Sequence, residues 1–413
     1  MTALPPRGRS AAAILDDLDR LSRDDVDWRS GRAFSLAYHA GPDVEALAEL
    51  AHARFAGSNM LNVAAFPSLR AMQADVLAMV GDLLHAGPAA AGSITSGGTE
   101  SLLLAVKAAR GLARAERGVE RPRMVLPTTA HAAFEKAAAD YGVESVRVPV
   151  GPDFRAVPAA IEAAIDDDTV LVACSAPSYP QGVVDPVAEI AAVAASRGLP
   201  CHVDACMGGL VLPMLERAGE PVTPFDFRVP GVTSMSVDLH KYGYAPKGVS
   251  VLLHRDKRRR SFQAFSTDNW LGGFYGSLGV LGTRGGGPLA AAWAVMNRLG
   301  AEGYLGLACE ARAATLELAG ALRKRPGVRL LAPPDATLLA FGFDDADAFA
   351  VGAALARRGF WVDQQSPPPS LHCTVNAVHR GVICDFLAAL DEAHEEVRRS
   401  GSRAEAKAYG RAE

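Results

Sequence analysis

The residue with the clearest chemical potential in this chain is Lys241, which follows His240 at the end of an apolar run. Residues 232–237 predict a short β-strand, and Gly243 and Pro246 then break the chain into a turn. A lysine at the carboxyl end of a strand in an open α/β sheet lies where ligands gather. Loss of water there weakens its preference for the charged form, so the amine can attack a carbonyl group and form a Schiff base. A surface lysine whose stem covers apolar side chains fits the same local sequence, so other segments must decide.

A glycine-rich turn supplies a second chemical element. Gly97, Gly98 and Thr99 lead into residues 102–110, a strong helix-forming run. Unhindered backbone N–H groups at a helix N-terminus, aided by the helix dipole, can hold a phosphate dianion. An ordinary loop with a polar helix cap is the alternative for this turn.

A third element is Asp204, which ends a short apolar run and is followed by small residues. A carboxylate in that position can keep a pyridine nitrogen protonated, and a protonated ring accepts electrons from a developing carbanion. An aspartate that caps a helix is the alternative. Cys201, His202 and Cys206 lie nearby, but no second Cys/His pair follows at zinc-finger spacing, so we expect no metal site.

Several segments match one enzyme family in chain order: residues 95–101, 129–134, 176–185, 202–209, 225–234 and 240–248. On these segments the chain resembles the pyridoxal-phosphate-dependent group II decarboxylase superfamily, and most of all the sphingosine-1-phosphate lyases of the soluble bacterial type. The resemblance is loosest near the carboxyl terminus. It implies pyridoxal 5′-phosphate as cofactor and an α/β fold of pyridoxal-phosphate type I, similar to aspartate aminotransferase. That fold has a mostly parallel central sheet and a smaller C-terminal α+β domain.

The resemblance also implies roles for single residues. Lys241 is then the Schiff-base lysine, Asp204 the partner of the pyridine nitrogen, and His131 the residue stacked on the ring. An imidazole face suits the electron-poor ring, although a capping or core histidine is the alternative. Further cofactor contacts are expected from Gly97, Gly98, Thr99, Ser236, His240 and Thr283. Substrate contacts and catalytic proton transfer are expected from Tyr38, Tyr179 and Lys247, which match positions that line the substrate site.

Two positions depart from the family pattern. The family usually carries Asn-Pro-Leu-His-Pro in an early active-site segment, and this chain has Asn62 in place of the histidine. Asparagine forms hydrogen bonds but takes up no proton near neutral pH, so an acid, base or phosphate-charge role there is lost or moved. Gly276 stands where the family more often has a larger residue. We expect these changes to reshape the substrate pocket and to spare the cofactor chemistry.

By resemblance, the activity is retro-aldol cleavage of a phosphorylated long-chain amino alcohol of the sphingosine-1-phosphate type, to an aldehyde and phosphoethanolamine. An amino-acid decarboxylase is the alternative, because cofactor residues do not decide which substrate bond aligns with the ring. A catalytically silent pyridoxal-phosphate-binding protein is a third interpretation, against which the intact Lys241, Asp204 and His131 argue.

The composition fits a metabolic enzyme with a small-molecule substrate. A chain of 413 residues with 49% hydrophobic and 21% charged residues can bury a large core. The net charge of −4 argues against nucleic-acid binding, because no excess of lysine and arginine is available to neutralise phosphates. Six cysteines and an amino terminus unlike a secretion signal predict reduced thiols and a cytoplasmic location. Since no apolar run reaches the roughly 20 residues needed to cross a bilayer, we expect no membrane span.

Strand-like and helical runs alternate along the middle of the chain, a βαβ pattern that places the candidate residues at strand ends. We expect buried strands at residues 170–174, 201–204 and 249–253, and a small sheet from residues 328–331, 337–343 and 372–376. The expected domains are an N-terminal helical arm (1–60), a large cofactor-binding domain (61–300) and a small C-terminal domain (301–413). The resemblance further implies a homodimer with shared active sites, in which Thr283 reaches a neighbouring cofactor phosphate. A flexible glycine-rich turn explains the same residues.

Overall fold

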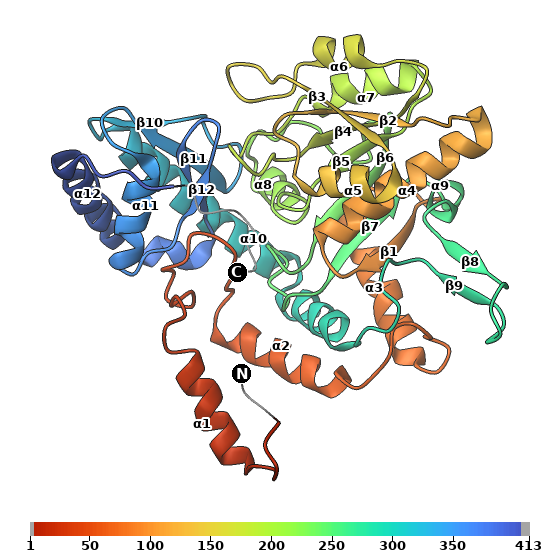
Figure 1. Cartoon of the computed structure of the whole chain (residues 1–413), viewed down its shortest axis with the longest axis horizontal. Helices are drawn as coiled ribbons and strands as arrows, with labels where there is room; N and C mark the ends of the chain where they lie inside the picture. The colour runs from red at the N-terminus through yellow and green to blue at the C-terminus, as the bar shows by residue number, and fades with distance from the viewer. Residues whose placement is uncertain (1–3, 406–413) are drawn as a thin grey trace.

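A seven-stranded sheet forms the centre of the molecule (Figure 1). The structure is a computed structural model that describes residues 4–405; residues 1–3 and 406–413, at the outer ends of the first and last expected domains, lie outside the described residues. The strand order is β1-β7-β6-β5-β4-β2-β3. The strands are β1 (Ala91–Thr95), β2 (Arg123–Pro127), β3 (Glu144–Val148), β4 (Thr169–Ser175), β5 (Cys201–Asp204), β6 (Val232–Asp238) and β7 (Ser250–His254).

Most of this sheet is parallel. The strands from β3 through β2, β4 and β5 to β6 pair in parallel, whereas β7 is antiparallel to both β6 and β1. The expected α/β architecture with a mostly parallel central sheet is therefore confirmed. Because parallel strands end at the same edge, the loops after β2, β4, β5 and β6 meet there.

Helices cover both faces of the sheet, as strands that are apolar on both sides require. In β2, Val125 packs into one core, and its neighbours Met124 and Leu126 pack into another. The core around Met124 is closed by α4 (Gly98–Arg117) and α5 (Ala133–Tyr141). The core around Val125 is closed by α3 (Pro67–Leu83), α7 (Val187–Ser196), α8 (Leu212–Arg217) and α10 (Gly287–Arg323).

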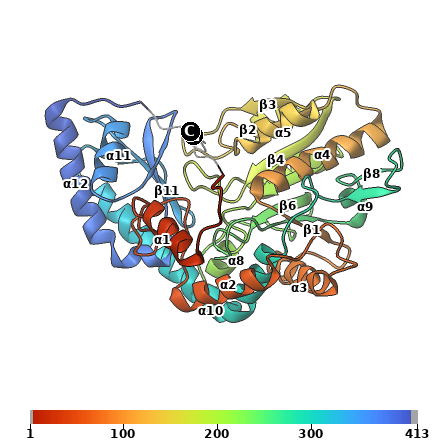
Figure 2. The same ribbon diagram turned by 60° about the horizontal axis from the view of Figure 1, so that its bottom comes forward.

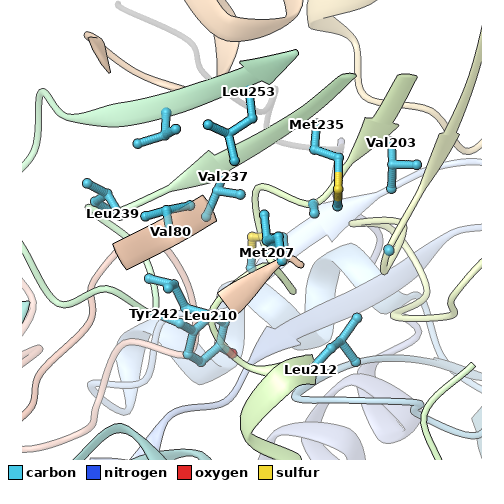
Figure 3. Close-up of a cluster of buried hydrophobic side chains, with 14 of the residues drawn as sticks. Val80, Val203, Met207, Leu210, Leu212, Met235, Val237, Leu239, Tyr242 and Leu253 are labelled. Carbon is cyan, nitrogen blue, oxygen red and sulfur yellow. The ribbon is translucent and has the colours of Figure 1, made fainter. Parts of the chain in front are cut away.

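Figure 3 shows part of the Val125 core. Met235 and Val237 of β6 point toward Met207 and Leu210, which belong to the segment that follows β5. Tyr242, next in sequence to Lys241, is also buried in this core, and its hydroxyl donates a hydrogen bond to the carbonyl oxygen of residue 375 at 2.6 Å. The backbone that carries the candidate lysine is thus fixed by packing on its inner side.

A second, antiparallel sheet of order β10-β11-β13-β12 lies beside the first, at the left of Figure 1. Its strands are β10 (Val328–Leu330), β11 (Leu338–Phe343), β12 (Asp363–Gln365) and β13 (Ser370–Thr374). It has its own apolar core with α11 (Ala348–Arg357) and α12 (Ile383–Ser400), preceded by the 3-10 helix η1 (Ala377–Gly381). Helix α10 runs between the two sheets and leaves helical geometry at Gly300, where φ is 55° and ψ −171°. The domain boundary expected at residue 300 stays a prediction, and this kink lies at that position.

The remaining elements lie at the periphery. They are α1 (Ala11–Leu21), α2 (Pro42–Phe55), α6 (Pro158–Ala164), α9 (Lys257–Ser261) and the hairpin of β8 (Phe265–Thr267) with β9 (Tyr275–Ser277). In Figures 1 and 2, α1 lies apart from the central sheet, and none of its residues is buried. Within residues 4–405, none of the helices combines the length and the apolar character that a bilayer crossing needs.

Candidate active site

The carboxyl ends of the parallel strands bring the main candidate residues to one edge of the central sheet. Asp204 is the last residue of β5 and lies opposite Ser236 in the parallel pairing with β6. Lys241 lies in the turn directly after β6, and His131 in the loop between β2 and α5. Tyr179 follows β4 at the same edge. The sheet topology alone therefore gathers residues that are far apart in the sequence.

Asp204 is held by hydrogen bonds within the sheet. Its Oδ1 accepts one from Ser236 Oγ and one from the Cys206 backbone N–H, each at 3.1 Å. Ser236 Oγ is also 3.3 Å from Nε2 of His202, and burial lowers the pKa of His202 to about 4, so that ring is neutral. Ser236, expected to contact the cofactor, therefore orients the carboxylate that is expected to face the ring nitrogen. With 8% of its surface exposed, Asp204 has a fixed direction and little contact with water.

Lys241 is paired with a carboxylate that the sequence motifs do not single out. Its Nζ lies 2.9 Å from Oδ2 of Asp238, the last residue of β6. Burial opposes the charge on Lys241, but the Asp238 carboxylate outweighs burial, and the pKa of Lys241 is raised above its ordinary value. In this structure the candidate nucleophile is therefore an ammonium group.

The glycine-rich turn forms the start of α4 and packs against the Lys241 turn. Gly97 is the N-cap residue, and Gly98 and Thr99 belong to the first helical turn, whose N–H groups have no acceptor within the helix. A Cβ atom on Gly98 would lie 2.8 Å from Asp238 Oδ2, and one on Gly97 would lie 3.4 Å from Cε1 of His240. The absence of side chains thus lets an anion-binding helix start approach the lysine closely.

His131 lies near both Asp204 and Lys241, whose charges act on its ring. Its Nδ1 accepts a hydrogen bond from the Ala133 backbone N–H at 3.1 Å, so the ring proton is on Nε2. Burial lowers the pKa of His131, and the charge of Lys241 lowers it further against the opposing effect of Asp204. The ring is therefore neutral at neutral pH, which suits stacking on an electron-poor ring.

These features fit pyridoxal phosphate. The start of α4, where Gly97 and Gly98 have no side chains, can hold its phosphate. The Lys241 amine lies in the turn that packs on this helix start. Asp204 lies on the neighbouring strand, where its carboxylate can pair with the ring nitrogen. The close approach at Gly98 is the specific observation, because any larger residue would separate the helix start from the lysine turn. Within the described part of the chain, no cluster of His, Cys, Asp and Glu is arranged to bind a metal ion.

Lys247 and Tyr38 form a second cluster next to the cofactor residues. Lys247 Nζ donates a hydrogen bond to the His240 carbonyl oxygen at 3.0 Å and lies 4.8 Å from the centre of the Tyr38 ring. The Tyr38 hydroxyl donates to Met207 Sδ at 3.8 Å. The crowding of protein atoms around the ammonium, followed by the charge of Lys241, lowers the pKa of Lys247 to about 8. Lys247 can therefore take up and release a proton close to neutral pH.

A cavity of about 1040 Å³ opens beside Tyr38 and Lys247. Its wall includes the apolar side chains of Val44, Ala48 and Phe360, and charged residues from the segment before Tyr38 also line it. A space of this size can take more than a small amino acid.

Tyr179 is bound to the small sheet. Its hydroxyl donates to Asp363 Oδ2 at 2.6 Å, and its ring lies on that of His372 with centroids 4.2 Å apart. Asp363 Oδ1 accepts a further hydrogen bond from Ser35 Oγ at 3.0 Å. The next residue, Pro180, has its carbonyl oxygen bound by Gln365 Nε2 at 2.7 Å. The structure thus ties Tyr179 to β12 and β13.

Asn62 and Thr283 lie at the surface. Asn62 is exposed and its Oδ1 accepts the Ala64 backbone N–H at 3.1 Å, which closes a local turn. Thr283 is exposed in the segment between β9 and α10. The roles expected for both residues, substrate contact for Asn62 and a neighbouring phosphate for Thr283, stay predictions.

Two buried carboxylates at the site are not identified by sequence reasoning. Asp238 pairs with Lys241, and Glu100 accepts hydrogen bonds from the backbone N–H groups of Ser96 at 2.6 Å and Val280 at 2.7 Å. Glu100 thereby ties the glycine-rich turn to the segment that contains Thr283. The signal for Asp238 is its place at the strand end three residues before the lysine, and the signal for Glu100 is its place in the first turn of α4.

Comparison with known proteins agrees with this geometry. Residues 2–325 match the model of the pyridoxal-dependent decarboxylase conserved domain. The chain is 38% identical over 400 residues to sphingosine-1-phosphate lyase 1 of Rattus norvegicus, a match that covers 96% of this chain and 70% of the relative. It is 37% identical over 403 residues to the sphingosine-1-phosphate lyase of Arabidopsis thaliana, a match that covers 96% of this chain and 74% of that relative.

Solved structures show the same fold. A sphingosine-1-phosphate lyase of Burkholderia pseudomallei superposes with a TM-score of 0.91 at 37% identity, over 97% of this chain and 94% of the other. A glutamate decarboxylase of Lactobacillus brevis superposes with a TM-score of 0.84 at 20% identity, over 97% and 95%, and shares the fold alone. Because the family model matches most of the chain and the lyase identities extend over nearly all of it, this protein belongs to the pyridoxal-dependent decarboxylase family.

Proposed function

We propose that this protein is a pyridoxal-phosphate-dependent lyase that cleaves a phosphorylated long-chain amino alcohol, of the sphingosine-1-phosphate type, to an aldehyde and phosphoethanolamine. The observation that carries the proposal is the 38% identity to a sphingosine-1-phosphate lyase over 96% of the chain. A glutamate decarboxylase of the same fold is only 20% identical. Lyases and decarboxylases share the fold, so the sequence likeness, and not the fold, favours the lyase.

Pyridoxal phosphate, when bound, supplies an electron sink for the pair released as the Cα–Cβ bond of the substrate breaks. Lys241 would hold the cofactor through Nζ at the end of β6. After its release, Nζ in the ammonium form that pairs with Asp238 would be the acid that protonates the substrate carbon. The N–H groups of Gly97, Gly98 and Thr99 would hold the cofactor phosphate at the start of α4.

Asp204 and His131 set the environment of the cofactor ring. Asp204 would place a negative charge at the ring nitrogen, and its hydrogen bonds from Ser236 and Cys206 fix the direction of the carboxylate. His131 is neutral and would pack against the ring face, where it would exclude water.

Lys247 and Tyr38 receive the substrate. We assign Lys247 to the substrate phosphate, because a lysine with a pKa of about 8 is charged in about 90% of molecules at pH 7. The Tyr38 ring supports this ammonium from a distance of 4.8 Å. The apolar part of the cavity beside these residues suits the long chain of the substrate. Asn62 and Tyr179 remain candidates for contacts to the polar end.

We further propose that the active form is a homodimer in the cytoplasm. Helix α1 exposes Leu15, Leu18 and Leu21 at 60%, 56% and 74%, and the β8–β9 hairpin exposes Leu271 and Phe274 at 107% and 76%. Apolar surfaces of this kind favour burial against another protein surface, and a second copy of the chain would supply it. Light scattering on the purified protein should give twice the mass of one chain, and a monomer that is fully active would contradict the homodimer.

All six cysteines are free thiols, which favours a reducing compartment.

The proposed activity is tested by mass spectrometry of the products. The cofactor-loaded protein is incubated with dihydrosphingosine-1-phosphate and, separately, with a panel of amino acids. Phosphoethanolamine and a fatty aldehyde from the lipid are the expected result, and they would show that Asn62 is tolerated in place of histidine. Carbon dioxide and an amine from one amino acid, with the lipid unchanged, would make the protein a decarboxylase. A Lys241→Ala variant should be inactive toward both classes of substrate.

A further inference from the structure

Asp238 is the most deeply buried charged group next to Lys241. Only 2% of its surface is exposed, yet its Oδ2 lies 2.9 Å from Lys241 Nζ, and Ser250 Oγ donates a hydrogen bond to its Oδ1 at 2.5 Å. A buried carboxylate is costly unless it is paired and hydrogen-bonded. Both requirements are met here, one by Lys241 and the other by a hydroxyl group on the neighbouring strand β7.

The charges around Lys241 favour this pair. The titratable groups that act on the pair or on its neighbours are Asp238 and His240 from the end of β6, Cys206 and Asp204 from β5 and its following segment, His131 from the loop after β2, Lys247 from the same turn, and Tyr38 from the N-terminal segment. Burial raises the pKa of Asp238, but Lys241 and then His240 outweigh it, so the pKa of this carboxyl is lowered. Asp238 is thus an anion and Lys241 a cation, and each stabilises the charge on the other.

Asp238 also lies directly against the glycine-rich turn. A Cβ atom on Gly98 would be 2.8 Å from its Oδ2 and 2.9 Å from its Oδ1. The carboxylate therefore occupies the space between the predicted phosphate cradle and the lysine. Only the neutral amine of Lys241 can attack the cofactor aldehyde, so the proton that Asp238 favours must leave before attachment.

We propose that Asp238 is a positioning residue that holds the Lys241 ammonium at the end of β6 and thereby sets the pH above which this lysine can attach a carbonyl compound. The inference rests on the role of Lys241 in the proposed function. In the attachment step Nζ loses a proton to solvent, adds to the aldehyde carbon, and the aldehyde oxygen leaves as water. Without Asp238, the lysine keeps the unfavourable effects of burial and of the nearby Lys247 but loses its counter-ion.

The test measures attachment and not turnover. Cofactor-free protein is mixed with pyridoxal 5′-phosphate, or with pyridoxal, at a series of pH values, and the link is fixed at short times by borohydride reduction. Mass spectrometry then quantifies the modified Lys241 peptide. Pyridoxal lacks the phosphate, so it separates an effect on the lysine from an effect on phosphate binding at Gly98. In the Asp238→Asn variant, the midpoint of the pH profile should move down by about 1–3 units with both aldehydes, which is the range for loss of one close ion pair.

Two further variants make the result specific. Ser250→Ala keeps the Asp238 carboxylate but removes the hydrogen bond that fixes its position. The carboxylate is then held less closely to Lys241 Nζ, so the midpoint should move in the same direction by a smaller amount. This variant serves as the test if circular dichroism shows that Asp238→Asn does not fold. Asp185→Asn is the matched control, because Asp185 is also fully buried, with its carboxylate bound by the N–H groups of Ala156 and Ser175 and not by Lys241. Its midpoint should equal that of the unchanged protein.

The outcomes separate this inference from the proposed function. If the unchanged protein links neither aldehyde to Lys241, both the proposed function and this inference fail. If Lys241 is linked but the midpoint of Asp238→Asn stays the same or rises, only the inference fails. An equal shift in Asp185→Asn would also overturn it, because the effect would then be general to buried carboxylates.

Discussion

The acidity of Lys247 can be tested directly by changing this residue to arginine and to methionine. The crowding of protein atoms around the ammonium, and then the charge of Lys241, lower the pKa of Lys247 from 10.5 to about 8. At pH 7 this raises the share of neutral amine from about 0.03% to about 10%, roughly 300-fold, because each pKa unit is a factor of ten. If the charged form holds the substrate phosphate, kcat/KM should be constant below pH 8 and fall about tenfold per unit above it.

The two variants should differ in a defined way. Arginine stays charged throughout the accessible range, so Lys247→Arg should retain much of the activity and lose the decline above pH 8. Methionine has no charge, so Lys247→Met should lower kcat/KM about 10–150-fold at all pH values, which corresponds to about 1.5–3 kcal/mol for a hydrogen bond to a charged group. The profile is to be measured on fully cofactor-loaded enzyme, in which Lys241 Nζ carries the cofactor and its charge contributes less to the shift, so the decline should begin at pH 8 or above.

The assay is the initial rate of phosphoethanolamine release from about pH 6 to about pH 10, with the cofactor content of each variant checked by absorbance. A decline near pH 8 that persists in Lys247→Met would show that another group titrates, and the assignment of Lys247 would be wrong. An increase of kcat/KM above pH 8 in the unchanged enzyme would instead indicate that the neutral amine is the active form.

Three other substitutions have defined outcomes. Gly98→Ala places a Cβ atom 2.8 Å from Asp238 Oδ2, and because overpacking costs about 1–3 kcal/mol, the dissociation constant for pyridoxal phosphate in an absorbance titration should rise about tenfold or more; unchanged affinity would contradict the close approach. Asp204→Asn keeps an acceptor for its two hydrogen bonds, so the melting temperature should hold while kcat falls about 100-fold or more, and near-normal kcat would refute the ring-nitrogen role. Tyr179→Phe removes the 2.6 Å hydrogen bond to Asp363 and should lower the free energy of unfolding in urea by about 1–3 kcal/mol, an effect that Asp363→Asn should show only in part.

Several strands of the central sheet were predictable because they are short buried runs rich in apolar residues, whereas β3 (Glu144–Val148) contains three polar residues and is mostly only partly buried. The expected strand 201–204 agrees with β5 (Cys201–Asp204), and the run 232–237 lies within β6 (Val232–Asp238). The small sheet was only partly predictable, since β12 (Asp363–Gln365) consists of polar residues and has no hydrophobic pattern. Its strand character comes from pairing with β13, which a local sequence does not reveal.

In the site, too, residues marked by a local sequence pattern were predictable, and residues that depend on distant contacts were not. Lys241, Asp204 and His131 could be proposed because each follows a recognisable strand, and the parallel topology then brings them together. The partner of Tyr179 could not be found in this way, because Asp363 is 184 residues away and belongs to the other sheet. Asp238 lies only three residues before Lys241 in the sequence. Its importance depends on whether its side chain points toward Lys241, and that direction is set by the packing of β6 against β7, which the sequence does not reveal.

The contacts of the loop after β4 limit where the coding sequence can be cut without loss of activity. The family model ends at residue 325, before β10, yet Tyr179 and Pro180 are bound by Asp363, Gln365 and His372 of the small sheet. A shortened gene that stops at residue 325 would encode every residue assigned to the cofactor and still leave this loop without its partners. The segment that matches the family model is therefore shorter than the segment that must be inherited together for activity. Recombination between relatives that replaces the region after residue 325 should give an active enzyme only when the new region also supplies the partners of this loop.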